Sequence, residues 1–135
     1  MNRKQARENA FLLLFEREIN KDEDSLEIIV KAAKERGLEC DEYVKTIYFG
    51  ALENRDEIEE AIEKSLVGWK RERVSYVSRA LLTLATYEMM YIDDIPTKVS
   101  INEAIELSKK YDEEKAYVFV NGVLHAVSKL VRCDE

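Results

Sequence analysis

Three cations near the start of the chain, Arg3, Lys4 and Arg7, have the types and spacing to bind an anion, and no acid lies among them. At about 100° per residue they project within one quadrant of a helix, and Phe11 and Phe15 extend that quadrant. Cations bind phosphate oxygens and aromatic rings stack on unpaired bases, which is how single-stranded RNA is usually held. The helix dipole also favours an added anion at a basic first turn. The pattern fits either an RNA or anion site or an ordinary solvated face.

A second candidate surface lies in the stretch KAYVFVNG, residues 115–122. Apolar residues at helical spacing already supply a buried stripe there, so Phe119 lies either at the edge of the core or within it. Gly122 inside a helix costs up to about 1 kcal/mol relative to alanine. We therefore expect another helix or a ligand backbone to approach closely at Gly122.

Other kinds of site are not supported by residue types or spacing. The chain has no glycine-rich phosphate loop and no dinucleotide-binding fingerprint, and its single histidine, His125, favours a structural or solvent-facing role. Cys40 and Cys133 are far apart in the sequence and have too few partners for a zinc site, so we expect reduced thiols. We expect no enzymatic activity, no metal site and no cofactor.

The composition is that of a single globular unit. The chain has 135 residues, of which 46% are hydrophobic and 36% charged, and its net charge of −7 argues against binding nucleic acid with the whole surface. Any anion site must be local. No run approaches the roughly 18 apolar residues of a membrane span, and we expect a cytoplasmic protein.

Four glycines and one proline leave little material for hairpins, so the predicted fold class is all-α. Periodicity predicts a helix over about 3–19 and a second one from a candidate N-cap at Ser25 to a stop at Gly37. It also predicts one long helix from a cap at Asp41 to about 66. An irregular joint at 67–74 follows, and then helices over 75–91, 100–111 and about 113–131. Ser100 and Glu103 have the spacing of a capping box for the helix over 100–111.

Four segments together resemble the NusB family: RKQAR, RALLTLATYEMMY, DIPTKVSINEAIELSKKY and FVNGVL. The resemblance covers nearly the whole chain in order. It implies a single all-helical domain of about six to seven helices in two sub-bundles, at about 1–69 and 70–135. It also implies a transcription antitermination factor that binds the boxA element of ribosomal RNA leader transcripts. The implied partners are NusE, a ribosomal small-subunit protein, and the RNA polymerase antitermination complex.

The resemblance implies RNA contacts by the cations, which would bind phosphates, and by aromatic residues, which would stack on bases. Many relatives carry a lysine immediately before FVNG, where this chain has Val118, so one cation of the family is missing. The residues expected to face RNA are Arg3, Lys4, Arg7, Phe15, Lys115, Phe119 and Asn121.

Two alternatives remain open from the sequence. NusB-like domains also serve as the RNA-binding part of ribosomal RNA methyltransferases when fused to a catalytic domain, and a chain of this length argues against that role. The resemblance also includes NusB-like proteins that form stable dimers in which the RNA-binding face is covered. The chain could therefore instead be a helical homo-oligomerisation module.

Overall fold

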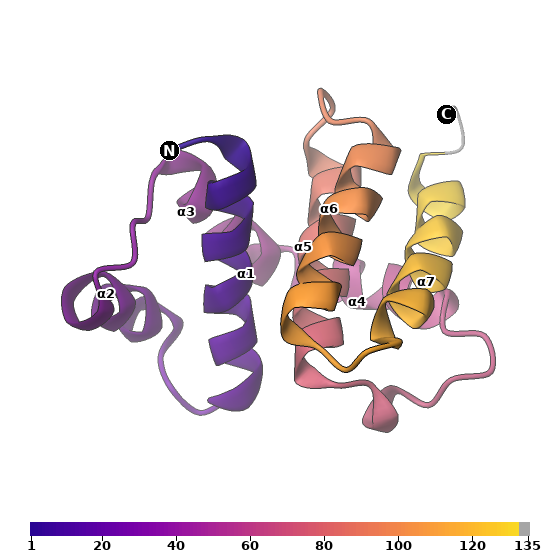
Figure 1. The fold of residues 1–135 in the computed structure, drawn as a ribbon, viewed down its shortest axis with the longest axis horizontal. Helices are drawn as coiled ribbons and strands as arrows, with labels where there is room; N and C mark the ends of the chain where they lie inside the picture. The colour runs from indigo at the N-terminus through magenta and orange to yellow at the C-terminus, as the bar shows by residue number, and fades with distance from the viewer. Residues whose placement is uncertain (133–135) are drawn as a thin grey trace.

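A computed structural model describes residues 1–132 of the chain, and within them lie seven α-helices and one short 3-10 helix. The prediction of an all-α fold with about six to seven helices is confirmed. The third and fourth helices follow each other with only Asn54 between them, and Figure 1 shows the arrangement of all the helices. The elements are α1 (Arg3–Ile19), α2 (Ser25–Arg36), α3 (Glu42–Glu53), α4 (Arg55–Lys64), η1 (Arg71–Arg73), α5 (Tyr76–Tyr91), α6 (Thr97–Tyr111) and α7 (Ala116–Val131).

Several helix ends follow the local rules that the sequence indicates. The side chain of Asp41 accepts a hydrogen bond from the backbone N–H of Val44, which satisfies a donor that the first turn of α3 leaves free. The α2 helix ends at Gly37, whose φ of 64° lies in the left-handed region that glycine adopts without steric cost. The cap of α2 is Asp24, one residue before the predicted Ser25.

The prediction of one long helix from Asp41 to about residue 66 is wrong, because the chain breaks at Asn54 into α3 and α4. Both the backbone N–H and the side-chain amide of Asn54 donate to the carbonyl of Gly50, at 3.0 and 2.8 Å. The asparagine therefore ends α3 by satisfying a terminal carbonyl, and α4 starts in a new direction immediately afterwards.

The predicted capping box at Ser100 and Glu103 is also wrong. The α6 helix begins one turn earlier, at Thr97 after Pro96, and no side chain caps its start. Ser100 is fully buried in the first turn, and its hydroxyl donates to a carboxylate oxygen of Glu88 on α5. The serine joins two helices instead of starting one.

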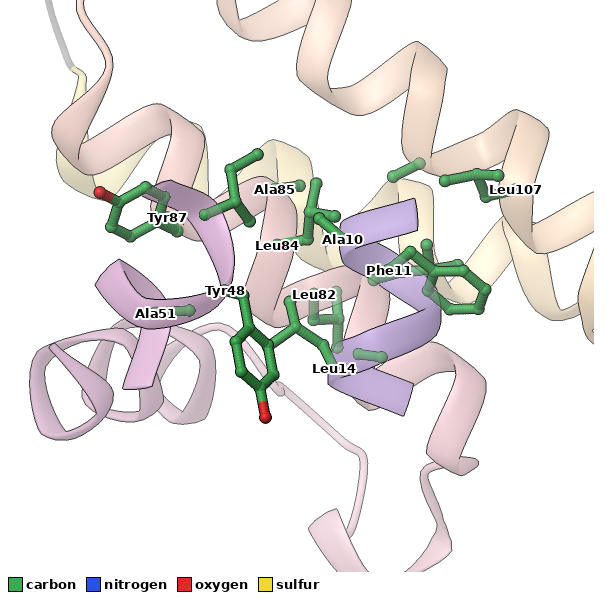
Figure 2. Packing of buried hydrophobic residues seen from close by; sticks show 14 of the residues in the cluster. Ala10, Phe11, Leu14, Tyr48, Ala51, Leu82, Leu84, Ala85, Tyr87 and Leu107 are labelled. Carbon is green, nitrogen blue, oxygen red and sulfur yellow. The ribbon is translucent and has the colours of Figure 1, made fainter. Parts of the chain in front are cut away.

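The core lies around α5, whose side chains are buried between α1, α3, α6 and α7. Figure 2 shows Phe11 and Leu14 of α1 beside Leu82 of α5 within this cluster. At Gly50 of α3, an added Cβ would overlap the ring of Tyr87 on α5. The glycine that weakens α3 locally thus allows α3 and α5 to pack closely.

The division into sub-bundles at about residues 69 and 70 stays a prediction. The α4 helix, which that division assigns to the first half, lies against α5 and α7. Within residues 1–132, no helix combines the length and the apolar character needed to cross a membrane.

Candidate nucleic-acid interface

Two cations of the predicted set, Arg3 and Lys4, are exposed on the first turn of α1, which contains no acid. The side chain of Asn2 caps this turn by accepting a hydrogen bond from the backbone N–H of Gln5, at 2.8 Å. The Arg3 guanidinium lies 4.3 Å from the centre of the Tyr43 ring, a cation–π contact that orients it without neutralising its charge. Both cations are therefore held at the surface near the positive end of the helix dipole.

The acids near these two cations are Asp94 and Glu103, and they differ in exposure. An Arg3 nitrogen lies 3.9 Å from an Asp94 carboxylate oxygen, and both side chains are about half exposed or more. The Lys4 ammonium lies 3.3 Å from a Glu103 carboxylate oxygen, and 67% of the Lys4 side chain remains exposed. An exposed pair such as Arg3 and Asp94 contributes little to stability, so a phosphate could replace Asp94 at small cost. Glu103 is held more firmly, because only 23% of its side chain is exposed and it also pairs with Arg7.

Arg7 occupies a different environment, because it is buried with only 3% of its surface exposed. Its Nε donates to Glu88 Oε2 at 2.8 Å, and its Nη1 lies 3.6 Å from Glu103. The hydroxyl of Tyr43 donates to the same Glu88 oxygen, and the hydroxyl of Ser100 donates to the other one at 3.0 Å. We refer to Arg7, Tyr43, Glu88 and Ser100 as the buried polar network, which joins α1, α3, α5 and α6.

The electrostatics of this network determine the protonation states of Arg7 and Tyr43. Burial alone would lower the pKa of the Arg7 guanidinium, but the charge and hydrogen bond of Glu88 outweigh burial and hold that pKa above its usual value. Burial, the charge of Glu88 and the hydrogen bond to it together raise the pKa of the Tyr43 hydroxyl. The tyrosine thus stays a neutral donor and the arginine stays charged.

The expectation that Arg7 and Phe11 extend an exposed quadrant is wrong, since both are buried in the core. Further along α1, the same side of the helix packs against α5. An RNA contact by Arg7 itself stays a prediction, and in this structure Glu88 holds its guanidinium.

Phe15 is half-buried toward the other end of α1 and lies 6.0 Å, ring centre to ring centre, from Phe11. It lines a groove between α1 and the segment after α2, beside the ion pair of Arg36 and Glu16 at 2.7 Å. Twelve residues separate it from Arg3, which is roughly 18 Å along a helix. Phe15 is therefore not adjacent to the exposed cations of the first turn.

The second predicted cluster lies at the start of α7. Lys115 is exposed at the N-cap position, while Phe119 and Asn121 are half-buried one turn further on. The Phe119 ring meets the Trp69 ring edge to face, with 4.7 Å between centres and 60° between planes. Phe119 thus lies at the edge of the core, which agrees with one of the two placements open from the sequence.

Trp69 and Phe119 line an open groove of about 610 Å³ between the loop after α4 and the exposed side of α7. Gly122 lies in the same groove, and a Cβ added there would meet nothing within 4 Å. The expected close approach of another helix at Gly122 is therefore wrong. We refer to this feature as the Trp69 groove.

The structure does not bring the seven predicted residues into one site. Figure 1 shows the start of α1 at one end of the bundle and the start of α7 at the opposite end, with α5 and α6 between them. Arg3 and Lys4 lie together at the start of α1, Lys115 and Phe119 line one groove at the start of α7, and Asn121 does not line that groove.

The histidine and cysteine side chains, which could serve catalysis or metal binding, do not lie at either of these surfaces within the described residues. His125 is exposed on α7, and Cys40 is a half-buried free thiol whose pKa burial raises. Cys133 lies outside the described residues. Across residues 1–132, no group of three or more His, Cys, Asp and Glu side chains is placed to hold a metal ion.

Two residues that matter to these surfaces were not identified as such from the sequence. Trp69 was assigned only to the joint after α4, although a single tryptophan beside Gly68 and Lys70 in a loop could have indicated an exposed ring. Glu88 looked like one more position on a helix. Only the fold shows that it meets Arg7, which lies 81 residues earlier.

The chain matches known proteins over nearly its full length. Residues 4–129 match the model of the NusB family. The transcription antitermination protein NusB of Bacillus subtilis is 44% identical over 92% of this chain and 92% of its own length. The structure of T. maritima NusB is 36% identical, with a TM-score of 0.83 over 96% of this chain and 92% of that one.

A third match is a chain in a crystal structure of the antitermination factors NusB and NusE in complex with dsRNA. It is 32% identical, with a TM-score of 0.83 over 95% of this chain and 96% of that one. Family model, sequence relatives and solved structures agree over the same residues, and the chain belongs to the NusB family.

Proposed function

We propose that this protein is a transcription antitermination factor that binds boxA-type RNA of ribosomal RNA leader transcripts together with NusE. In that role it would help RNA polymerase to read through terminators. The proposal is a binding function and not a catalytic one. Because such a factor acts on nascent bacterial transcripts, we also infer that it works in the cytoplasm.

The observation that carries the proposal is the similarity to the chain crystallised with NusE and dsRNA, which extends over 95% of this protein. With 32% identity and a TM-score of 0.83 over that length, the two chains share the fold on which a common binding surface would form. The 44% identical relative in Bacillus subtilis carries the antitermination name and has nearly the same length.

The surfaces of the chain support an RNA-binding role through local charge. With a net charge of −7, the protein needs concentrated cations to attract a polyanion, and Arg3 and Lys4 provide them at the start of α1. Lys115 provides another beside the half-buried ring of Phe119. Cations would fix the position of the RNA backbone, and the aromatic residues Phe119 and Phe15 would stack on bases.

Within this proposal the roles of the predicted residues differ. Arg3 and Lys4 are free to bind phosphates directly, whereas Arg7 supports that surface from below through Glu88, which also holds Tyr43 beneath Arg3. Asn121 is half-buried on α7, and its side-chain amide would donate or accept one hydrogen bond at a base edge.

The test is fluorescence anisotropy of a short labelled boxA RNA titrated with this protein, alone and with NusE, at two salt concentrations. A scrambled RNA and a double-stranded form of the same sequence serve as controls. We expect boxA RNA to bind more tightly than the scrambled strand, more tightly still with NusE, and less tightly at high salt. Equal binding of boxA and scrambled RNA under every condition would contradict the proposal.

The same samples distinguish the remaining alternative of a homo-oligomerisation module. Sedimentation of the free protein and of the RNA mixture reports the mass of each species. A stable oligomer that binds neither RNA nor NusE at any salt concentration would favour self-association over antitermination.

A further inference from the structure

Glu103 on α6 lies beside the exposed cations at the start of α1. Its two carboxylate oxygens lie 3.3 and 3.5 Å from the Lys4 ammonium, and one of them lies 3.6 Å from Nη1 of Arg7. The residue does not cap α6, which begins at Thr97 without a side-chain cap. The carboxylate therefore faces the proposed RNA surface without a part in starting the helix that carries it.

Of the two acids paired with these cations, Glu103 is the one held in place. The Asp94 side chain is 75% exposed and lies 3.9 Å from Arg3. Glu103 instead pairs with the buried Arg7, which is itself hydrogen-bonded to Glu88 at 2.8 Å. Because a buried cation keeps its counter-charges, an incoming phosphate displaces Asp94 into solvent while Glu103 stays where it is.

A fixed carboxylate restricts which part of a nucleic acid can lie next to it. An ionised carboxylate accepts hydrogen bonds and donates none, so it repels a phosphate and binds a hydroxyl or an amino group. The ribose 2′-OH is such a donor, and DNA lacks it. Dinucleotide-binding proteins use the same combination, in which a helix start holds the phosphate and an acid accepts from the ribose hydroxyl. The first turn of α1 with Lys4, and Glu103 beside it, provide both parts.

The space for a nucleotide is a groove of about 360 Å³ between α1 and α6, and Lys4 and Glu103 both line it. Glu8 lines the same groove, but its carboxylate already accepts hydrogen bonds from Lys110 and Tyr111. Glu103 is therefore the carboxylate of this groove that lies against an RNA-binding cation.

We propose that Glu103 makes this surface select RNA over DNA, by accepting a hydrogen bond from the 2′-OH of a ribose whose neighbouring phosphate is bound by Lys4. Arg7 is the positioning residue, because its pair with Glu103 holds the carboxylate in place. This inference rests on the proposed RNA-binding function and adds a specificity-determining residue to it. Every ribose carries the hydroxyl, so Glu103 distinguishes the sugar and not the base.

The test compares two labelled strands by fluorescence anisotropy on the full chain. One is boxA RNA, and the other is DNA of the same sequence with deoxyuridine for uridine, so that the strands differ only in their 2′-hydroxyls. We expect the wild type to bind RNA about tenfold more tightly, within the range of a hydrogen bond to a charged group. In Glu103→Ala this preference should disappear, because DNA gains affinity when the repelling charge is removed and RNA also loses its acceptor.

Three further variants separate hydrogen bonding from charge. Glu103→Gln keeps a neutral acceptor of the same shape and should retain part of the preference. Asp94→Asn removes the displaceable acid, and Glu106→Gln removes an exposed acid of the same groove. Both controls should leave the ratio of RNA to DNA affinity unchanged. The ratio compares two ligands on one protein, so a loss of stability in a variant does not alter it.

Single 2′-deoxy substitutions along the RNA locate the contact. We expect one position to weaken binding to the wild type and to have no effect on binding to Glu103→Ala. The same substitution should weaken binding to Asp94→Asn as much as to the wild type.

Two results would overturn the proposal while the proposed function stands. One is equal affinity of the wild type for the RNA and DNA strands. The other is an unchanged ratio in Glu103→Ala, with both affinities raised alike, because Glu103 would then act only as a repelling charge. If no RNA binds to the wild type at any salt concentration, the proposed function fails together with this inference.

Discussion

The buried polar network and the Trp69 groove contain similar residue types, but the network is buried and the groove is open to solvent. In the network, the guanidinium of Arg7 and the hydroxyl of Tyr43 both donate to the carboxylate of Glu88, which is fully buried. In the groove, Lys115 and Phe119 lie beside Trp69 with no carboxylate in the lining. Both regions place a cation next to an aromatic ring, yet only the groove leaves them available to a ligand.

The difference teaches that spacing along one helix does not reveal whether a cation is available. Arg3, Lys4 and Arg7 lie within one quadrant of a helix, but the packing of α1 on α5 buries Arg7 and leaves the other two cations exposed. The partner that decides this is Glu88, which comes from a distant part of the sequence. A buried charge needs such a partner because desolvation is costly.

The largest expected effect is on the network. Glu88→Ala removes the hydrogen-bonded counter-charge of the buried Arg7 and leaves it only the longer 3.6 Å pair with Glu103, so we expect the free energy of unfolding to fall by about 3 kcal/mol. Urea denaturation measures the loss. Glu60→Ala, which removes the exposed pair with Lys64 at 2.9 Å, is the matched control and should cost less than about 0.5 kcal/mol. Similar losses in the two variants would show that Glu88 does not hold Arg7 in the folded protein.

A smaller loss is expected at Ser100, through its hydrogen bond to Glu88 at 3.0 Å. Ser100→Ala should cost about 1.5–3 kcal/mol, the value of a buried hydrogen bond to a charged group. A double-mutant cycle with Glu88→Gln identifies the cause, because a shared hydrogen bond gives a coupling energy above about 0.5 kcal/mol. Additive effects would mean that Ser100 stabilises the first turn of α6 independently of Glu88.

The sequence predicts most of the fold, because local rules determine most helix ends here. Glycine at 37 and aspartate at 41 have local effects on the backbone, so their positions are enough to predict the end of α2 and the start of α3. The break at Asn54 has no adjacent glycine or proline to indicate it, and the apolar spacing continues across it from α3 into α4. Ser100 and Glu103 have the spacing of a cap, but burial against α5 uses the serine differently.

The candidate site is less predictable than the fold. Exposure of Arg3, Lys4 and Lys115 agrees with the pattern, since charged residues at helix starts are usually solvated. The contact between Trp69 and Phe119 joins residues 50 positions apart through a loop, and periodicity contains no information about it. Long-range pairs of this kind come from the packing of α4 on α7.

At the groove, Gly122→Ala should change stability and binding in opposite directions. The added Cβ meets nothing within 4 Å and alanine favours a helix, so we expect a gain of about 0.5–1 kcal/mol in the free energy of unfolding. Because the methyl group occupies groove space, RNA affinity should fall. Thermal unfolding and anisotropy measure the two quantities, and a loss of stability would indicate a close contact at Gly122 after all.

The smallest expected effect on stability is at Glu8 of α1, which is partly buried and paired with Lys110. Hydrogen bonds from Lys110 and Tyr111, on α6, lower the pKa of Glu8 below its usual value of 4.5. A lowered pKa in the folded state gives stability that is present above pH 4.5 and is lost as pH falls through the folded pKa. Glu8→Gln should therefore cost less than about 1 kcal/mol at pH 7 and weaken the acid dependence of unfolding.

That dependence is measured by urea denaturation of both proteins between about pH 3 and pH 7. The difference in unfolding free energy should shrink as the solution becomes more acidic. A constant difference across this range would contradict the lowered pKa.

The central claim is that Arg3 and Lys4 are available to RNA while Arg7 belongs to the fold. The most direct test is the salt dependence of RNA affinity for the double variant Arg3→Gln, Lys4→Gln, with unfolding free energy measured on the same protein. The account predicts unchanged stability and a log–log salt slope smaller in magnitude by about 1.4, because two phosphate contacts are lost from a single strand. An unchanged slope would contradict it, since the exposed cations of α1 would then make no contact with RNA.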